Sequence, residues 1–400
     1  MYANVHRRGQ ERQRLRGDFL FLGMTSLSIW EQESFYAPKD IIIVGAGLMG
    51  LWSAWELLQQ NPSLRIVILE RNSSPLGAST RNAGFACFGS PTELMSDMET
   101  MGTNDMLQVV EMRYKGIEKI KQHFSDEAIG FEHCGGYECI NKDSRFWPAF
   151  DDRISQLNKL LKDITGHRSI FKYAGNKLGD LGLQHFDTLM ENSTEAALHS
   201  GKLVQTLTQQ LLIKGVSILS GFAVKEWQKG QQGFEVLSEN QQSIKGTQLI
   251  FCTNAFSNSL LNTTTVEPGR GQIILTSPIT NLSMKGTFHF DEGYYYWRHL
   301  GNRILLGGGR NAAFDAENTT DMNGSDIIRN TLASFLQKHL SPAIQYTIEH
   351  SWSGIMGFTE NKRPFTGYVK EGAYLAIACN GMGVALTPMI AEKVASDILS

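Results

Sequence analysis

Three glycines and a carboxylate, Gly45, Gly47, Gly50 and Glu70, are the strongest chemical signal in this 400-residue chain. Residues 45–50 read Gly-Ala-Gly-Leu-Met-Gly, which fits the G-x-G-x-x-G pattern of a turn from a strand into a helix. Gly45 permits the tight turn, Gly47 lets the backbone approach a pyrophosphate, and Gly50 allows close packing of the helix on the strand. The start of such a helix offers free N–H groups and a positive dipole end. We therefore expect phosphate contacts from Gly45, Ala46, Gly47, Leu48, Met49 and Gly50.

The flanking segments supply the elements that this turn needs. Residues 41–44 are apolar throughout, as in a parallel strand that is buried on both faces. Leu51, Trp52, Trp55 and Leu58 recur at helical spacing, which predicts a helix with a buried face. A second apolar strand ends at Glu70, where an acidic side chain meets the ribose hydroxyls of an adenine dinucleotide. Because no basic residue replaces this glutamate, NADP is disfavoured; the competing interpretation is a glycine-rich turn in another α/β protein.

The loop after Glu70 carries a resemblance to a known family. Glu70-Arg71, followed by Gly77-Ala78-Ser79-Thr80-Arg81-Asn82-Ala83-Gly84, resembles the second flavin-contacting segment of the D-amino-acid-oxidase-like family. That family includes glycine oxidase, sarcosine oxidase and gamma-glutamylputrescine oxidase, and the resemblance extends from Asp40 to Leu399. A surface loop rich in turn-forming residues is the alternative. The resemblance implies flavin contacts by Glu70, Arg71, Ser79, Thr80, Arg81, Asn82, Ala83, Gly84, Val224, Thr253 and Asn254.

A second strand–glycine–helix junction lies near the C-terminus. Residues 373–378 read as a strand, residues 379–384 as a glycine turn, and a helix follows to Ile398. In the resembled family, this junction places backbone N–H groups of Gly381, Met382, Gly383 and Val384 against the far end of the flavin. A helix N-terminus stabilises the negative charge of a reduced flavin, and an NAD enzyme does not need it. The two junctions together favour FAD over NAD.

A hairpin over residues 293–309, with its turn at Gly301-Asn302, is the candidate substrate region. Tyr294, Tyr296 and Arg298 alternate along the strand, so they share one face. Aromatic walls with few polar groups are typical of small-molecule pockets, although such a stripe can also be sheet packing. We expect Tyr296 and Arg298 to position the substrate. The motifs here resemble gamma-glutamylputrescine oxidase-like members more than glycine oxidase.

The resemblance implies oxidation of a carbon–nitrogen bond in an amine or amino acid. A hydride passes from the carbon next to nitrogen to flavin N5, the imine hydrolyses, and oxygen or an electron carrier accepts the electrons. Glycine oxidase-like members hold the substrate carboxylate with an arginine at the position of Met356, so Arg298 or Arg310 is the candidate replacement. No cysteine lies between Cys252 and Cys379, so we expect non-covalent FAD.

Composition limits the other classes of function. The chain is 42% hydrophobic and 19% charged with a net charge of −3, which is ordinary for a globular protein of two domains. This net charge does not indicate nucleic acid or an anionic membrane as a partner. No apolar run is long enough to span a membrane. The five scattered cysteines fit a reducing compartment, and we expect a cytoplasmic protein. Cys134 and Cys139 are not accompanied by a second pair of cysteines that could complete a zinc site, so we expect no metal.

The predicted fold is α/β, with a Rossmann-like FAD-binding domain that is discontinuous in sequence and an α+β substrate domain built on an antiparallel sheet. We assign residues 40–110, 195–267 and 350–400 to the FAD-binding domain. Residues 111–194 and 268–349 form the substrate domain. Residues 1–39 are an extension with an arginine-rich start, for which a disordered arm, a weak signal peptide and a true start at Met24 are all open.

Three other functions compete with the flavin amine oxidoreductase. An NAD-linked dehydrogenase is disfavoured by the C-terminal glycine junction. A flavoprotein module acting on a modified tRNA base is disfavoured because no stripe of lysine and arginine lies beyond the first sixteen residues. An FAD-binding protein without turnover is compatible with every motif. The sequence leaves the oligomeric state open.

Overall fold

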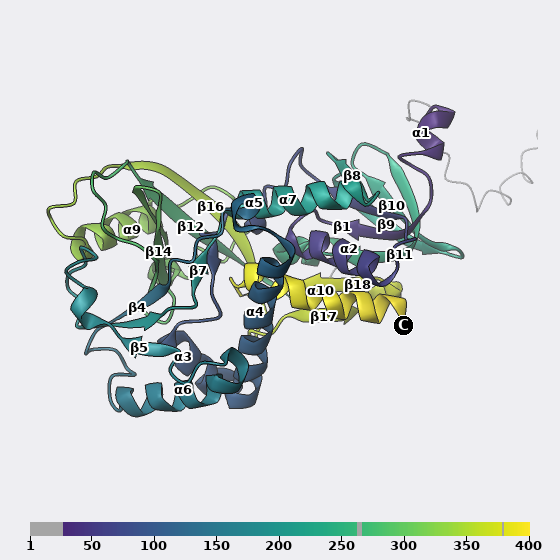
Figure 1. Cartoon of the computed structure of the whole chain (residues 1–400). Helices are drawn as coiled ribbons and strands as arrows, with labels where there is room; N and C mark the ends of the chain where they lie inside the picture. The colour runs from purple at the N-terminus through teal and green to yellow at the C-terminus, as the bar shows by residue number, and fades with distance from the viewer. Residues whose placement is uncertain (1–26, 262–265, 378–379) are drawn as a thin grey trace, which may run out of the picture.

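Two eight-stranded sheets lie side by side in the computed structural model, which describes residues 27–261, 266–377 and 380–400 (Figure 1). Helix α4 (Thr103–His123) links them, since it contacts α10 (Gly383–Leu399) at one sheet and α3 (Pro91–Met101) and α6 (Phe150–Thr165) beside the other. The predictions for the arginine-rich start and Met24 lie outside the described residues. None of the described helices is long and apolar enough to cross a membrane.

The first sheet has the strand order β17-β18-β11-β1-β2-β8. At its centre, β1 (Lys39–Val44) pairs in parallel with β2 (Ile66–Glu70) and β11 (Ser243–Phe251). Residues 41–44 are buried because strands flank them on both sides and helices cover the sheet. The outer strands are β8 (Ser217–Ser220), β18 (Tyr374–Ile377) and the antiparallel β17 (Phe365–Tyr368), and the hairpin of β9 (Val224–Gly230) and β10 (Gly233–Ser238) extends from β11.

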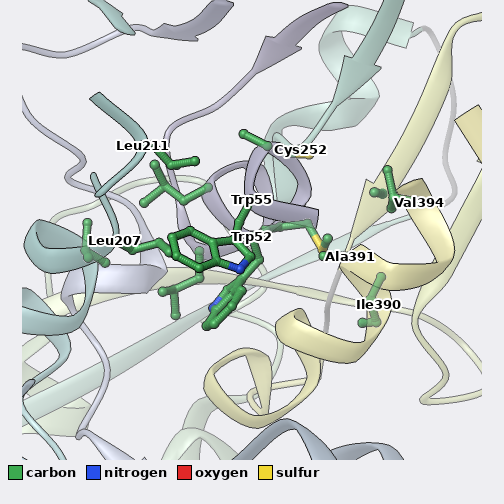
Figure 2. Close-up of a cluster of buried hydrophobic side chains, with 14 of the residues drawn as sticks. Trp52, Trp55, Leu207, Leu211, Cys252, Ile390, Ala391 and Val394 are labelled. Atoms are coloured by element: carbon green, nitrogen blue, oxygen red, sulfur yellow. The ribbon is translucent and has the colours of Figure 1, made fainter. Parts of the chain in front are cut away.

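Helix α2 (Leu48–Gln60) is buried along its whole first three turns, from Leu48 to Leu58. It is enclosed because α7 (Ser200–Ile213) and α10 both pack against it. Figure 2 shows Trp52 and Trp55 among side chains from these two helices, including Leu207 of α7 and Ile390 of α10. The sequence predicted one buried face, and the surrounding helices bury the other faces as well.

The second sheet has the order β16-β12-β15-β14-β13-β4-β6-β5 and is antiparallel except for the β13–β4 pair. Its hairpin of β14 and β15 turns at Gly301-Asn302, as predicted. Helix α9 (Asp326–His339) packs on β12 and β15. The strands are β4 (Gly136–Ile140), β5 (Phe171–Tyr173), β6 (Thr188–Asn192), β12 (Glu267–Thr276), β13 (Thr287–Phe290), β14 (Tyr295–Leu300), β15 (Arg303–Gly308) and β16 (Ile348–Phe358).

The α/β fold class is confirmed, and one detail of the predicted layout differs. The predicted domain boundary at residue 350 falls inside β16, so the division into two domains stays a prediction. The remaining short elements are α1 (Ile29–Glu33), α5 (Asp126–Ile129), α8 (Ser257–Leu261), β3 (Phe85–Ala86) and β7 (Ala196–Ala197).

Candidate active site

A cavity of about 760 Å³ is lined by residues from both sheets and from the starts of α2 and α10. This volume lies within the range of cofactor and ligand sites. All the predicted cofactor-contacting residues line the cavity except Ala46, Gly50 and Thr80. The structure thus brings together segments that lie more than three hundred residues apart in the chain.

Backbone packing explains the glycines at the start of α2. Gly45 has φ +109°, and a Cβ there would lie 2.7 Å from the carbonyl oxygen of Cys252. A Cβ on Gly50 would overlap the carbonyl oxygen of Gly45. Gly50 therefore lies behind the turn, where it lets α2 approach β1, and it does not line the cavity.

Polar groups at this end of the cavity suit a dinucleotide. The backbone N–H of Leu48 donates to Ser79 Oγ at 2.9 Å, so a hydroxyl occupies the start of α2 where a phosphate oxygen could replace it. The Glu70 carboxylate is buried and accepts from the backbone N–H groups of Ala46 and Asn72, each at 3.1 Å. Thr80 instead donates to the carbonyl oxygen of Pro75, which turns it away from the cavity.

The start of α10 forms another part of the cavity. Gly381 has φ +82°, and Gly381, Met382, Gly383 and Val384 all line the cavity. Helix α4 supports this junction from behind, since a Cβ on Gly116 would overlap the carbonyl oxygen of Ala385. Two helix N-termini and a buried glutamate therefore face one cavity, and this donor and acceptor set fits FAD.

The hydroxyl of Tyr296 lies at the cavity wall. Its ring lies over Gly307, the residue opposite it on β15, where a Cβ would clash with the ring. Phe85 packs edge-on against it, with ring centroids 5.9 Å apart. Burial raises the pKa of Tyr296 to about 12, so the hydroxyl keeps its proton. Among the described residues, no hydrogen bond to this hydroxyl is formed, so it is available to a ligand.

A buried ion pair, His289–Glu195, lies beside Tyr296 and was not anticipated from the sequence. His289 Nε2 is 2.6 Å from Glu195 Oε1, and the imidazole packs edge-on against Phe85. Burial alone would lower the pKa of His289, but attraction to Glu195 outweighs it and raises the pKa to about 9. His289 is therefore protonated at neutral pH. The Cys87 sulfur lies within 4.8 Å of the ligand atoms of both residues, and burial raises the pKa of its thiol.

Other charged side chains at this end of the cavity are paired. Arg113 bonds Glu93 at 3.0 Å, and Lys362 bonds the buried Asp97 at 2.9 Å. Glu292 accepts from Arg145 at 2.7 Å. The first contact joins α3 to α4, the second joins α3 to the loop after β16, and the third joins two loops of the second sheet. They could not be read from the sequence, because each pair joins positions far apart in the chain.

The two candidate arginines have different environments. Arg298 is 2% exposed and donates to the backbone carbonyls of Gly84, Leu198 and His299. It is not among the cavity-lining residues, so the structure does not support the predicted contact of Arg298 with substrate. It shares a strand face with Tyr296 but lies two residues further from the cavity. Arg310 does line the cavity.

Comparisons with known proteins agree with this geometry. A family model described as "FAD dependent oxidoreductase" (DAO) matches residues 40–396. A "Probable oxidoreductase OrdL" of Haemophilus influenzae is 24% identical over 375 residues, which cover 90% of this chain and 83% of the relative. The fold is similar to iminodiacetate oxidase from Chelativorans sp. BNC1 (TM-score 0.73, 17% identity, 90% of this chain and 95% of the other). It is also similar to L-proline dehydrogenase from P. horikoshii (TM-score 0.72, 17% identity, covering 90% of this chain and 92% of the other).

Proposed function

Because this chain belongs to the family of FAD-dependent oxidoreductases, we propose that it binds FAD non-covalently and oxidises the carbon–nitrogen bond of an amine or amino acid. The observation that carries the proposal is the shared cavity. Its lining includes the starts of α2 and α10, Glu70 and the aromatic side chains of Phe85 and Tyr296. A cofactor and a small organic substrate would thus lie in contact with each other there.

The proposed roles follow from the positions of the residues. The N–H groups at the starts of α2 and α10 would bind the negatively charged parts of the cofactor, and Glu70 would accept from its ribose. When bound, FAD supplies the acceptor for a hydride from the carbon next to nitrogen, and the imine product hydrolyses in water. Phe85 and the ring of Tyr296 would exclude water from the reacting carbon, while the Tyr296 hydroxyl orients the substrate.

His289 does not serve as a general base in this scheme. Its pKa of about 9 keeps it protonated at neutral pH, and Glu195 already accepts its Nε2 proton. It is the positive partner of the ion pair with Glu195 in the wall of the cavity. We propose that the substrate amine enters already neutral, which removes the need for a strong side-chain base.

The first test is the absorption spectrum of the purified protein. We expect two flavin bands that acid releases into solution, which would establish non-covalent FAD. Candidate amines and amino acids are then added without oxygen, and one class should bleach the flavin. Readmitting oxygen distinguishes an oxidase from a dehydrogenase that uses an electron carrier. A colourless protein that cannot take up FAD would contradict the proposal, and a yellow protein that nothing bleaches would favour FAD binding without turnover.

Two smaller proposals accompany this function. The four cysteines that the structure describes are all unpaired, which supports a cytoplasmic location. The described lining of the cavity mixes acidic and basic side chains and shows no basic stripe, so a small molecule suits it better than a tRNA.

A further inference from the structure

Arg310 lines the cavity without a carboxylate partner among the residues that the structure describes. Its guanidinium carbon lies 4.3 Å from the ring centroid of Phe314 and 4.6 Å from that of Phe358. The Arg310 Nε is buried and makes no hydrogen bond with any described residue. Its one acceptor among the described residues is the side-chain amide oxygen of Asn318. The two rings hold the guanidinium plane while leaving donors unused.

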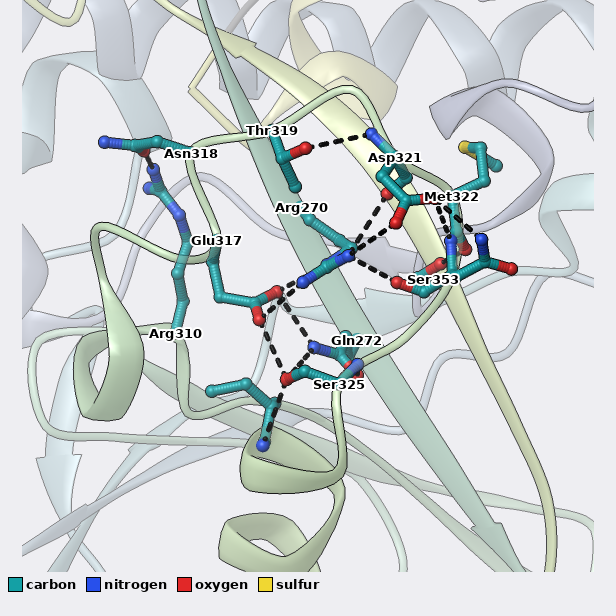
Figure 3. A network of polar contacts seen from close by, with 12 residues as sticks. Arg270, Gln272, Arg310, Glu317, Asn318, Thr319, Asp321, Met322, Ser325 and Ser353 are labelled. Carbon is teal, nitrogen blue, oxygen red and sulfur yellow. Dashed lines mark hydrogen bonds and ion pairs between the residues drawn. The ribbon is translucent and has the colours of Figure 1, made fainter.

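The buried carboxylate of Glu317, which precedes Asn318 in the chain, already accepts hydrogen bonds at both oxygens. It accepts a bidentate pair of hydrogen bonds from Arg270, at 2.8 and 2.9 Å. Gln272 and Ser325 donate to the same carboxylate at 2.8 and 2.9 Å. Figure 3 shows this network beside the Arg310–Asn318 contact. Both oxygens of Glu317 therefore already accept two hydrogen bonds each, so Glu317 attracts Arg310 only from a distance and accepts no hydrogen bond from it.

The same network fixes the segment that carries Arg310. The backbone N–H of Arg270 donates to the Glu317 carbonyl at 2.7 Å, and the Glu317 N–H donates to Ala313 at 3.1 Å. Ala313 ends the short helix that begins at Arg310. A buried ion pair on β12 thus anchors the loop and holds Arg310 at the cavity. A guanidinium that is held in place and unpaired is pre-organised for an external anion.

We propose that Arg310 binds the carboxylate of the substrate, which makes the substrate an amine that carries a carboxylate group. Burial lowers the pKa of Arg310 in spite of attraction by Tyr294, Glu317 and Glu267, yet an arginine stays charged, so a carboxylate in direct contact would stabilise it. The fork of a guanidinium matches both oxygens of a carboxylate. Met356 also lines the cavity, beside Tyr296, since a Cβ on Gly271 would lie 2.9 Å from its methyl group and 3.8 Å from the Tyr296 hydroxyl. This inference rests on the proposed function and specifies its substrate class.

The test is titration calorimetry of the FAD-loaded protein with benzoate and phenylacetate. The neutral amides, benzamide and phenylacetamide, have the same shape without the charge. We expect the carboxylates to bind at least tenfold more tightly than the amides. Arg310→Met should weaken carboxylate binding by about 10- to 100-fold and leave amide binding unchanged, as expected for loss of a hydrogen bond to a charged group. Arg310→Lys should recover part of the loss because it restores the charge without the fork.

Arg329→Met is the matched control. Arg329 lies on the exposed face of α9 and pairs with Asp326, so the variant loses one positive charge away from the cavity. It should bind both carboxylates like the wild type. Equal binding of carboxylates and amides by the wild type, or equal carboxylate binding by wild type and Arg310→Met, would overturn the assignment. Calorimetry measures binding and needs no turnover. Failure of the Arg310 assignment can therefore be distinguished from failure of the proposed function, in which no amine reduces the flavin.

Discussion

Two tyrosine hydroxyls at the same hairpin show why single side chains need the tertiary structure. Tyr294 and Tyr296 are equivalent in the sequence pattern, yet Tyr294 is 41% exposed while the Tyr296 ring is held between Phe85 and Gly307. Only a side chain that is fixed in this way can orient a substrate at low entropic cost.

We predict that Tyr296→Phe lowers the ratio of the rate constant of anaerobic flavin reduction to the substrate dissociation constant. The expected decrease is about 3- to 10-fold, the value of one neutral hydrogen bond. The phenylalanine ring retains the packing against Phe85, so the midpoint of thermal unfolding should stay within about 2 °C. Stopped-flow absorbance with the best substrate measures the rate. An unchanged rate would show that the hydroxyl does not contact the substrate.

The His289–Glu195 pair predicts a pH dependence of stability. The folded-state pKa of about 9 exceeds the ordinary histidine value of about 6.5. Between these values the folded protein holds a proton that the unfolded chain has lost. The stabilisation is therefore complete below pH 6.5 and is lost as the pH rises through 9.

Urea unfolding of wild type and His289→Gln across this window measures the effect. We expect the wild type to lose stability more steeply between pH 6.5 and 9 than the variant does. His133→Gln is the control, because His133 and its partner Asp126 are both exposed and such pairs contribute little. Parallel profiles for wild type and His289→Gln would show that the pair is not ionised as described.

At the scale of elements, contacts between backbones decide how closely a helix approaches the cofactor. A side chain on Gly50 would overlap the carbonyl of Gly45, whereas a Cβ on Gly179 would meet no atom within 4 Å. Both substitutions add one methyl group, so they form a matched pair.

We predict that Gly50→Ala pushes α2 away from β1, raises the dissociation constant of FAD at least tenfold and destabilises the protein by about 1–3 kcal/mol, as for overpacked cores. Gly179→Ala should change neither quantity. Fluorescence titration of cofactor-stripped protein with FAD measures the affinity. Wild-type affinity in Gly50→Ala would mean that the cofactor does not depend on this packing.

At the scale of the whole molecule, the cavity joins the two sheets. The start of α2 and Glu70 belong to the first sheet, while Tyr296, His289 and Arg310 come from the second. A ligand that fills the cavity should therefore stabilise both parts together.

We predict that FAD at 100 times its dissociation constant stabilises the stripped protein by about 2.7 kcal/mol. Riboflavin lacks the adenine and pyrophosphate that reach Glu70 and α2, so it should stabilise less at the same concentration. Thermal unfolding with each ligand measures the difference. Equal stabilisation by riboflavin and FAD would contradict the dinucleotide assignment at the first sheet.

Local periodicity and turn chemistry are enough to predict part of this fold. The β1–α2 junction, Glu70 at the end of β2, the hairpin at Gly301-Asn302 and the strand–helix junction at Gly381 were all predicted where the structure has them. Each depends on backbone conformation or on apolar spacing within about thirty residues, so neighbouring residue types suffice to indicate it. The family resemblance then supplied the order in which these elements assemble.

The partners of the charged groups are defined only once the chain is folded. Arg298 and Arg310 are equally plausible carboxylate ligands in the sequence, but Arg298 is bound by the carbonyls of Gly84 and Leu198. Arg310 has no carboxylate partner in the described part of the chain, because Glu317 is bonded to Arg270. The pairing of His289 with Glu195 likewise joins strands and loops that the sequence keeps ninety-four residues apart. Whether a charge is neutralised depends on partners brought together by folding, and no local pattern records that.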